Sequence, residues 1–342
     1  MGIKAGSVLA GVGLGYWAWN ALNPGPGASL RGQVALVTGG SRGLGLLIAR
    51  ELAELGCKVA ICARDEDELA RAQVELEALG AEVLAVRCDV GDRAEVSRML
   101  AEVVARFGTL DVLINNAGVI QVGPLASLTM RDFERAMASN FWGVVNVTLA
   151  ALPIMRRQGY GRIATIDSIG GRVAVPHLLP YDCAKFAARG FTEGLRAELA
   201  GTGIHVTTIL PGLMRTGSPL HAGFKGEHAL EFLWFSAADS TPLTAMDARR
   251  AAQRIVLAVR RGETELTLTW QAKLLGLAHD LFPATTINAL GLVNRLLPKA
   301  AGPSGTIEGA DIELPQSARP LRDTLNRQGD RTNQRPPASA IW

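Results

Sequence analysis

A tyrosine and a lysine four residues apart, Tyr181 and Lys185, are the pair in this sequence best placed for acid–base chemistry. Residues four apart share one face of a helix, so both side chains can point into one site. The pKa of a free tyrosine, roughly 10, is poorly matched to neutral pH, but a neighbouring ammonium group favours the phenolate. The spacing therefore predicts a proton donor or acceptor, with an ordinary surface pair on a helix as the alternative.

A glycine-rich stretch, VALVTGGSRGLG at Val34–Gly45, has the pattern of a strand, a tight turn and the start of a helix. Glycines let backbone amides approach a phosphate closely, and a helix N-terminus adds unpaired N–H donors and a favourable dipole. The spacing Thr38-Gly39-x-x-x-Gly43-x-Gly45 departs from the usual G-x-G-x-x-G fingerprint. We expect a dinucleotide-binding turn here, and the alternative is a turn that only joins a strand to a helix.

Strand-like and helix-like segments alternate through the middle of the chain. Short β-type runs are separated by helical patterns of ten to fifteen residues, which predicts a parallel, doubly wound sheet with right-handed crossovers. The strands are expected at 34–37, 58–63, 82–87, 111–114, 161–168, 205–210 and 263–269. We therefore predict an α/β fold with a single Rossmann-like doubly wound parallel sheet of about seven strands and helices on both faces.

Several polar residues fall at the carboxyl ends of the predicted strands. Besides the glycine turn, they are Arg64, Asp89, Asn115 and Ser168. Doubly wound sheets bind their ligands at these strand ends, so each of these residues becomes a candidate for function. For Ser168 the alternative is a strand-end hydroxyl in a turn.

One long helix is expected to carry a polar residue in its interior. Thr129 and Asp132 resemble a capping box, and the helical pattern continues to about Arg157 with Asn140 in its middle. Asn is a poor residue for a helix interior, so we expect a polar role for Asn140. A satisfied amide in the core is the alternative.

The composition fits a large folded domain with little net charge. Of the 342 residues, 48% are hydrophobic, and the net charge of +3 comes without a run of Lys and Arg. Nucleic-acid binding is therefore not expected. The four cysteines show no C-x-x-C spacing, which predicts reduced thiols and neither a disulfide framework nor a metal site.

Residues 1–31 form an apolar segment and a linker ahead of the predicted domain. No charged residue occurs from Ala5 to Leu30, and the apolar part, 5–22, is at the short limit for a membrane span. Tyr16, Trp17 and Trp19 lie at its end, where interfacial aromatics belong. We predict a membrane anchor, and the alternatives are a signal peptide, a flexible arm or a helix packed on the protein itself.

An ordered set of motifs connects these segments. They follow one another along the chain as Thr38-Gly39-x-x-x-Gly43-x-Gly45, Asn115-Asn116-Ala117-Gly118, Asn140, Ser168, Tyr181-x-x-x-Lys185 and Pro211-Gly212. Together they resemble the short-chain dehydrogenase/reductase family, over a catalytic domain at roughly residues 32–269. One position departs from the pattern, because Asp167 precedes the serine where a small residue is more usual.

The resemblance implies reversible hydride transfer between a nicotinamide and a carbonyl or alcohol. Tyr181 is then the acid in reduction and the base in oxidation. Ser168 holds the substrate oxygen beside it as an oriented donor. Lys185 favours the phenolate and hydrogen-bonds the nicotinamide ribose, while Asn140 orders a water and backbone link to Lys185. The predicted catalytic residues are Asn140, Ser168, Tyr181 and Lys185.

The family pattern also implies contacts to the rest of the cofactor. Asp89 and Val90 resemble the adenine contacts, and Thr216 matches a position that contacts the nicotinamide carboxamide. The predicted cofactor-binding residues are Thr38, Gly39, Ser41, Arg42, Gly43, Leu44, Gly45, Arg64, Asp89, Val90, Asn116, Ala117, Gly118, Tyr181, Lys185, Pro211, Gly212 and Thr216.

Charge at the end of the second predicted strand bears on the choice of cofactor. NAD-binding proteins usually place an acidic residue there to hold the ribose hydroxyls. Here Ala63 is followed by Arg64, and the glycine turn adds Arg42. Two guanidinium groups can grip a 2′-phosphate that a carboxylate would repel, so we predict NADP(H). The alternative for Arg64 is a solvated residue at a helix start.

The segment after the sixth strand, residues 213–244, is expected to form the lid over the substrate. Its aromatic run Phe232-Leu233-Trp234-Phe235 predicts an apolar pocket and a lipophilic substrate, although packing of a lid helix explains the run nearly as well. Residues 270–299 form an apolar helical extension that could lie on a membrane, cover the pocket or join subunits. Residues 300–342, rich in Pro, Gly, Arg, Asp and Gln, are predicted to be a disordered tail.

The favoured function is an NADP(H)-dependent oxidoreductase that transfers a hydride between nicotinamide and a lipophilic carbonyl or alcohol. The alternative is a non-catalytic NADPH-binding sensor or scaffold at a membrane, which would have no need of all four catalytic side chains. We expect a cytoplasmic catalytic domain, anchored through residues 5–22, that forms a homo-oligomer, as the resembled family commonly does.

Overall fold

The computed structural model of the chain describes residues 29–240, 245–299, 302 and 304–334. The predicted membrane anchor at 5–22 lies outside the described residues.

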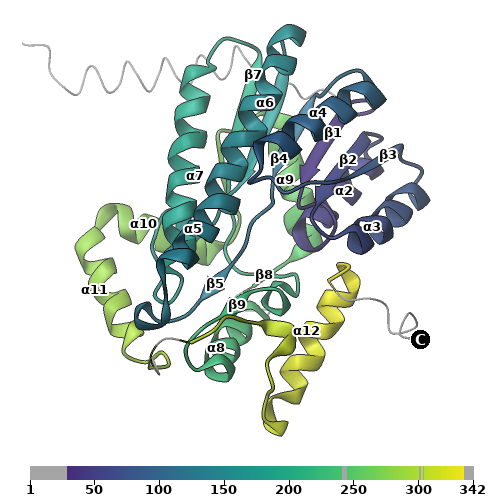
Figure 1. Cartoon of the computed structure of the whole chain (residues 1–342). Coiled ribbons are helices and arrows are strands. Elements are labelled where there is room, and N and C mark those ends of the chain that lie inside the picture. The colour runs from purple at the N-terminus through teal and green to yellow at the C-terminus, as the bar shows by residue number, and fades with distance from the viewer. Residues whose placement is uncertain (1–28, 241–244, 300–301, 303, 335–342) are drawn as a thin grey trace, which may run out of the picture.

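A seven-stranded parallel sheet forms the centre of the fold (Figure 1). The strand order is β11-β7-β6-β4-β1-β2-β3. The chain adds β2 and β3 on one side of β1 and then crosses over to add β4 and the later strands on the other side. In the register, Leu36 of β1 lies between Ala60 of β2 and Leu113 of β4. The strands are β1 (Val34–Thr38), β2 (Lys58–Ala63), β3 (Val83–Arg87), β4 (Val112–Asn115), β6 (Gly161–Ile166), β7 (Ile204–Leu210) and β11 (Glu265–Thr267). The sequence prediction of about seven parallel strands is confirmed.

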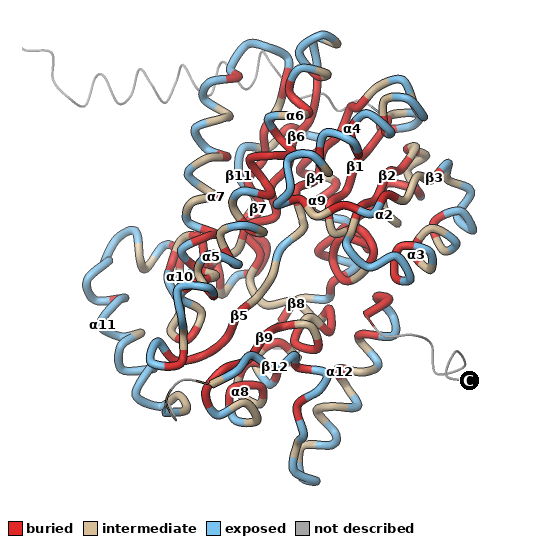
Figure 2. The backbone as a smooth tube through the Cα atoms, in the orientation of Figure 1, coloured by how far each residue is buried: buried red, intermediate tan, exposed pale blue. Residues whose placement is uncertain are grey.

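Helices cover both faces of the sheet, as its buried apolar side chains require (Figure 2). The first face carries α2 (Gly43–Glu54), α3 (Glu66–Ala78) and α9 (Ala248–Arg261), and the second carries α4 (Arg93–Phe107), α6 (Gly143–Gln158) and α7 (Leu179–Glu198). Asp65 and Asp92 cap α3 and α4 by accepting hydrogen bonds from first-turn amides. Cys57, Cys62 and Cys88 are buried, Cys183 is exposed, and all four are free thiols.

The long helix predicted around Asn140 is interrupted at that residue. α5 (Met130–Met137) and α6 are joined by a π-helical turn at Ala138–Trp142, and Asn140 lies within it. The capping box at its start is confirmed, because the Asp132 carboxylate accepts from the Thr129 amide at 2.7 Å. Among the described residues, the span 130–158 is the one helical stretch long and apolar enough to cross a membrane. Half of its most apolar window is buried inside the fold, as befits a core helix.

A smaller lobe lies beyond the carboxyl ends of the strands. It contains β5 (Gln121–Val122), β8 (Met214–Arg215), β9 (Gly223–Phe224), α8 (His228–Ser240) and β10 (Met246–Asp247). Its core joins Phe224, Phe232 and Phe235. Packing of the lid helix therefore accounts for Phe232 and Phe235 of the aromatic run, while Leu233 and Trp234 are half-buried.

The prediction of a disordered tail over 300–342 is wrong for its described part. β12 (Ile307–Glu308) pairs antiparallel with β9, and α12 (Arg319–Arg331) packs against α8 (Figure 1). The physical reason is a few well-spaced apolar residues in a polar stretch. Ile312 and Leu325 are buried in the core of the smaller lobe, which we call the lid core, and Leu314 and Leu321 pack against it. Average composition does not reveal such contacts.

The apolar extension forms a helical pair, α10 (Trp270–Leu281) and α11 (Pro283–Asn294), at one edge of the molecule (Figures 1 and 2). Most of α11 is exposed, and Thr286 is its one buried residue. Each of these apolar residues is more than half exposed: Trp270, Leu274, Leu277, Leu281, Phe282, Ile287, Leu292 and Leu296.

Candidate active site

The predicted site residues gather at the carboxyl edge of the sheet. The chain switches sides of the sheet between β1 and β4, and ligands of doubly wound sheets bind in the crevice at such a point. The glycine turn follows β1, Asn116 follows β4, and Ser168 follows β6. The topology alone therefore brings segments more than one hundred residues apart to one edge.

The turns after β1 and β4 are held together by hydrogen bonds. Thr38 Oγ1 accepts from the amides of Asn116 at 2.9 Å and Ala117 at 3.0 Å. In return, Asn116 Nδ2 donates to the carbonyl oxygens of Thr38 and Gly39 at 3.0 and 3.1 Å. These contacts fix the shape of the glycine turn before any ligand binds.

The glycines of these turns stand where a side chain has no room. A Cβ on Gly45 would lie 2.1 Å from the carbonyl oxygen of Gly39, and a Cβ on Gly118 would lie 2.3 Å from Asn140 Oδ1. Gly39, at φ +62°, also has the left-handed backbone that favours glycine. The amides of Leu44 and Gly45, in the first turn of α2, donate to no described residue. The turn therefore offers close approach and unpaired donors, which fits the diphosphate of a nicotinamide dinucleotide.

The acid–base pair and the serine are brought together. Tyr181 and Lys185 lie one turn apart on α7, with the Lys185 Nζ 5.7 Å from the centre of the tyrosine ring. Ser168, after β6, hydrogen-bonds Tyr181 in the direction that stabilises the phenolate. Lys185 is buried, and its Nζ donates to the carbonyl oxygen of Ile166 at 2.7 Å.

Burial dominates the titration of this group of residues. It raises the pKa of Tyr181 well above its usual value, and Ser168 opposes the shift only in part. Burial also lowers the pKa of Lys185, while the neighbouring Asp167 carboxylate acts in the opposite direction. Tyr181 is therefore a protonated phenol at neutral pH in this structure, a form that can donate a proton.

Asp167 is a buried acid beside this site. It is 3% exposed, and burial raises its pKa to about 7 against the opposing charges of Lys185 and Arg189. A Cβ on Gly171 would lie 2.5 Å from Asp167 Oδ2, so glycine there makes room for the carboxyl group. The sequence marked Asp167 as unusual but gave no sign of its pKa.

Asn140 is completely buried in the π-helical turn and bonds to the loop after β4. Its Nδ2 donates to the Val119 carbonyl at 2.9 Å, and its Oδ1 accepts from the Val119 amide at 3.1 Å. This satisfied amide fixes the position of the loop that carries Gly118. The water link from Asn140 to Lys185 stays a prediction.

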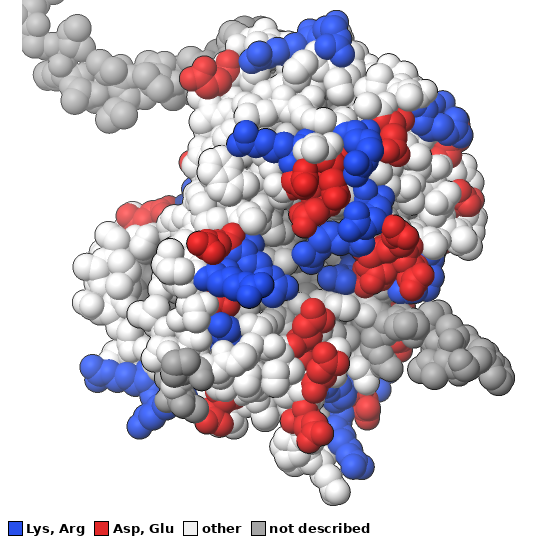
Figure 3. Space-filling view, in the orientation of Figure 1, with Lys and Arg blue, Asp and Glu red and all other residues white. Residues whose placement is uncertain are grey.

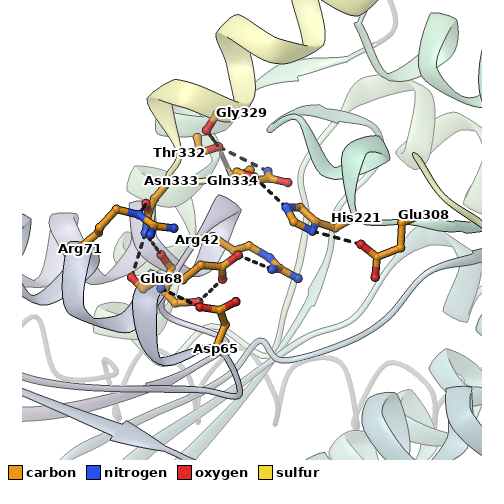
Figure 4. Close-up of polar contacts among 11 residues, drawn as sticks. Arg42, Asp65, Glu68, Arg71, His221, Glu308, Gly329, Thr332, Asn333 and Gln334 are labelled. Carbon is orange, nitrogen blue, oxygen red and sulfur yellow. Dashed lines mark hydrogen bonds and ion pairs between the residues drawn. The ribbon is translucent and has the colours of Figure 1, made fainter. Parts of the chain in front are cut away.

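The two arginines predicted at the 2′-phosphate have different surroundings. Arg42 donates to Glu68 at 2.6 Å, and the Ser41 hydroxyl donates to the same carboxylate at 3.0 Å (Figure 4). Glu68, only 6% exposed, was not among the predicted residues, because it lies in the first turn of α3 and not at the end of a strand. Arg64 is exposed and makes no hydrogen bond or ion pair with a described residue.

The other predicted cofactor residues border the same region. Asp89 accepts from the Gly91 amide, and Val90 is buried after β3. The Pro211 carbonyl accepts from Ile169 at 2.9 Å, which joins the turn after β7 to the segment that follows Ser168. Thr216 is 4% exposed and directly follows β8 in the lid. Among the described residues, no group of three His, Cys, Asp or Glu could hold a metal ion.

A doubly wound sheet with a glycine turn after β1 and a Ser-Tyr-Lys group beside it defines a class of nicotinamide-dependent oxidoreductases. The family model for short chain dehydrogenases matches residues 33–220. The chain belongs to the short-chain dehydrogenase/reductase family and is an oxidoreductase of that type.

Relatives and solved structures agree with this assignment. A putative oxidoreductase, SadH, of Mycobacterium tuberculosis is 37% identical over 72% of this chain and 89% of its own length. A putative ketoacyl reductase of Streptomyces coelicolor is 41% identical over 54% of this chain and 71% of its own. The structure of an actinorhodin polyketide ketoreductase with NADPH is similar, with a TM-score of 0.63 and 33% identity over 70% of this chain and 97% of that chain. A short-chain dehydrogenase of Streptomyces avermitilis has a TM-score of 0.67 and 30% identity over 77% of this chain and 98% of that chain.

Proposed function

We propose that this protein is an NADP(H)-dependent reductase of lipophilic ketones or aldehydes that can also run as an alcohol dehydrogenase. The observation that carries the proposal is the half-buried Tyr181 one helical turn from Lys185 and beside Ser168, next to a glycine turn with unpaired amides. A nicotinamide, when bound, supplies or accepts the hydride at the carbonyl carbon. The chain's own residues supply the proton and hold the oxygen.

Each polar side chain has a separate task in this proposal. The Ser168 hydroxyl and the Tyr181 phenol both donate to the carbonyl oxygen, which gains electron density as the C–H bond forms. Tyr181 then transfers its proton to that oxygen, which completes the alcohol. Lys185 holds its charge near the phenolate left behind, and Ile166 fixes the orientation of its ammonium group. In oxidation the same steps run backwards.

The preference for NADP(H) rests on positive charge near the predicted ribose position. Arg64 follows β2 and is exposed, so its guanidinium group can reach a 2′-phosphate without breaking another contact to a described residue. Arg42 lies in the glycine turn after β1, where it donates a hydrogen bond to Glu68. The actinorhodin ketoreductase with NADPH, a relative at 33% identity, adds support.

The substrate class is proposed from relatives and from the lid. Two similar proteins are named as putative ketoacyl reductases, one from Streptomyces violaceoruber and one from Streptomyces coelicolor. Their names point to a ketone on an acyl chain. The half-buried Leu233 and Trp234 of the lid are compatible with an apolar substrate.

The proposal is tested by following NADPH consumption with a panel of aliphatic, aryl and acyl-thioester ketones. Tyr181→Phe should lower kcat by at least about 100-fold while the Kd for NADPH stays within about twofold. Turnover retained in Tyr181→Phe would contradict the acid role. NADPH binding without turnover in either direction, on ketones or alcohols, would favour the sensor or scaffold.

We also propose that the α10–α11 pair lies on a membrane surface. Its exposed apolar residues form a face that is largely uncharged in Figure 3. The charged residues within 281–299 are both basic, Arg295 and Lys299. Basic residues beside an apolar helix suit an anionic lipid surface, and the apolar segment 5–22 would provide a second attachment. Hydrogen exchange of residues 270–297 should slow when vesicles of phosphatidylcholine and phosphatidylglycerol are added.

Leu292→Glu should remove this protection, whereas Val74→Glu, at an exposed apolar residue of α3, should not. Exchange unchanged by vesicles would contradict membrane contact by α10–α11 whatever residues 5–22 do. A homo-oligomer, common in the family, is proposed as well, and the mass measured by light scattering in detergent tests it.

A further inference from the structure

The C-terminal segment Thr332–Gln334 lies against the glycine turn. It follows α12, whose Leu325 is completely buried in the lid core, so the helix holds the segment in place. The chain reverses at Asn333, which has a left-handed backbone with φ +54°, a conformation that Asn tolerates better than most residues after a helix. All three residues are less than 10% exposed. We name Thr332–Gln334 the C-terminal clasp.

One side of the clasp is hydrogen-bonded to the glycine turn and to α3 (Figure 4). The Gly43 amide donates to the Thr332 carbonyl at 2.8 Å. Asn333 Nδ2 donates to the backbone carbonyls of Ser41 at 2.8 Å and Glu68 at 2.9 Å, while its Oδ1 accepts from Arg71 at 2.8 Å. The Asn333 side chain thus makes three hydrogen bonds at the elements predicted to recognise the 2′-phosphate.

The other side of the clasp bonds to the lid. The Thr332 hydroxyl donates to the Thr216 carbonyl at 2.8 Å, and Gln334 Nε2 donates to the same oxygen. His221 Nε2 donates to the Gln334 carbonyl at 2.8 Å (Figure 4). Thr216 is the residue predicted at the nicotinamide carboxamide, so the clasp spans from one end of the predicted dinucleotide site toward the other.

A dinucleotide that contacts both the glycine turn and Thr216 occupies the region that these contacts bridge. The clasp pays no large entropy on closing, because α12 already holds it in position. Breaking it exposes at least three buried side-chain and backbone polar groups, which opposes opening. A bridge of this kind slows both entry and departure of whatever lies between the two walls.

We propose that the C-terminal clasp is part of the cofactor site and closes over the bound dinucleotide. The clasp connects the glycine turn to the lid, so release of the cofactor requires Thr332–Gln334 to detach from both. The proposal rests on the proposed function, since it takes the dinucleotide to be the ligand between these walls. It assigns a binding role to residues outside the 33–220 span that the family model matches.

Asn333→Gly is the sharpest variant for a test. Glycine adopts the left-handed backbone without strain, so the change removes the three side-chain hydrogen bonds and leaves the turn intact. The matched control is Arg327→Ala, at an exposed residue of α12. Alanine is used there and not glycine because a glycine inside the helix would weaken α12 itself. A chain that ends at Arg331 removes the clasp entirely.

The measurement is stopped-flow fluorescence of NADPH on the full chain, with dissociation followed by displacement with excess NADP⁺. Asn333→Gly should raise the dissociation rate constant about tenfold or more, and the chain ending at Arg331 should raise it further. Association should also be faster. The single-turnover rate of hydride transfer and the melting temperature of Asn333→Gly should stay close to those of Arg327→Ala.

An unchanged dissociation rate in Asn333→Gly would overturn the clasp. A lower Kd for NADPH would overturn it too, because it would show that the segment competes with the cofactor. Parallel measurements with NADH separate this result from failure of the proposed function. A wild-type chain that prefers NADH contradicts the NADP(H) proposal, and the same rate comparison with NADH still decides the clasp. Binding of neither dinucleotide would overturn both.

Discussion

Arg42 donates a hydrogen bond to Glu68 at 2.6 Å, so a guanidinium group predicted to hold the cofactor's 2′-phosphate is already paired with a carboxylate. The Ser41 hydroxyl donates to the same group. Glu68 therefore occupies donors that a 2′-phosphate needs, and its negative charge repels that phosphate. If NADPH is the cofactor, as proposed, we expect its affinity to be set by competition between this carboxylate and the 2′-phosphate.

Glu68→Gln should raise the affinity for NADPH severalfold and leave that for NADH nearly unchanged. The amide keeps an acceptor for Ser41 but removes the negative charge beside the phosphate. The ratio of kcat/KM for the two cofactors gives the measurement. Glu77→Gln makes the same charge change at the exposed far end of α3 and should leave the ratio as it is. Equal gains for both cofactors would show that Glu68 does not act on the 2′-phosphate.

Asp167 should set part of the pH dependence of alcohol oxidation. Its ionised carboxylate raises the pKa of Tyr181, and oxidation requires the tyrosine to accept a proton. Asp167→Asn removes that charge, so the rising limb of the pH–rate profile should move to lower pH, by up to about one unit. Glu198→Gln, at an exposed carboxylate near the end of α7, is the control. A profile that does not move, or moves to higher pH, would contradict this coupling.

The parts of this chain that sequence predicted well are those governed by local periodicity. Alternating apolar strands and capped helices such as the one that begins after Asp65 specify the sheet, and the order of the motifs specifies the family. The pairing of Arg42 with Glu68 was not predictable in the same way, because it depends on how a turn and a helix 26 residues on meet in space. The clasp was missed for a related reason: three polar residues within a polar stretch carry no periodic signal.

Two buried acids should make the fold less stable at alkaline pH. Burial raises the pKa of Asp182 to about 8 and that of Asp239 to about 7. The unfolded chain releases these protons near pH 4, so the folded state binds more protons between about pH 4 and 8. The contribution of these two groups to the unfolding free energy is thus fully present below about pH 4 and is lost as the pH rises through the folded-state pKa values of about 7 and 8.

Asp182→Asn should therefore lose less unfolding free energy between pH 5.5 and 8.5 than the wild-type protein does. Urea unfolding followed by circular dichroism at both pH values measures the difference. Asp67→Asn, an exposed acid in the first turn of α3, is the comparison. If the two variants lost stability equally with pH, Asp182 would not be the titrating group.

The buried ion pair between Lys225 and Asp132 ties the lid to the helix that leads to Asn140. Lys225 Nζ lies 2.7 Å from Asp132 Oδ2, and each side chain is only 8% exposed. Burial alone would raise the pKa of Asp132, but hydrogen bonds from Lys225 and Thr129 outweigh it and hold that pKa below its usual value. Lys225→Met should cost about 3–5 kcal/mol of unfolding free energy, because it leaves a buried carboxylate without its partner.

The double variant Lys225→Met/Asp132→Asn should recover much of that loss, since no charge is then left unpaired and the asparagine side chain can still accept from the Thr129 amide. Urea unfolding of the two single variants and the double variant closes a thermodynamic cycle. Losses that simply add would mean that the two charges act independently. A recovered double variant would show that the pair's contribution is mainly to avoid a lone buried charge, and that the lid can be held to α5 without it.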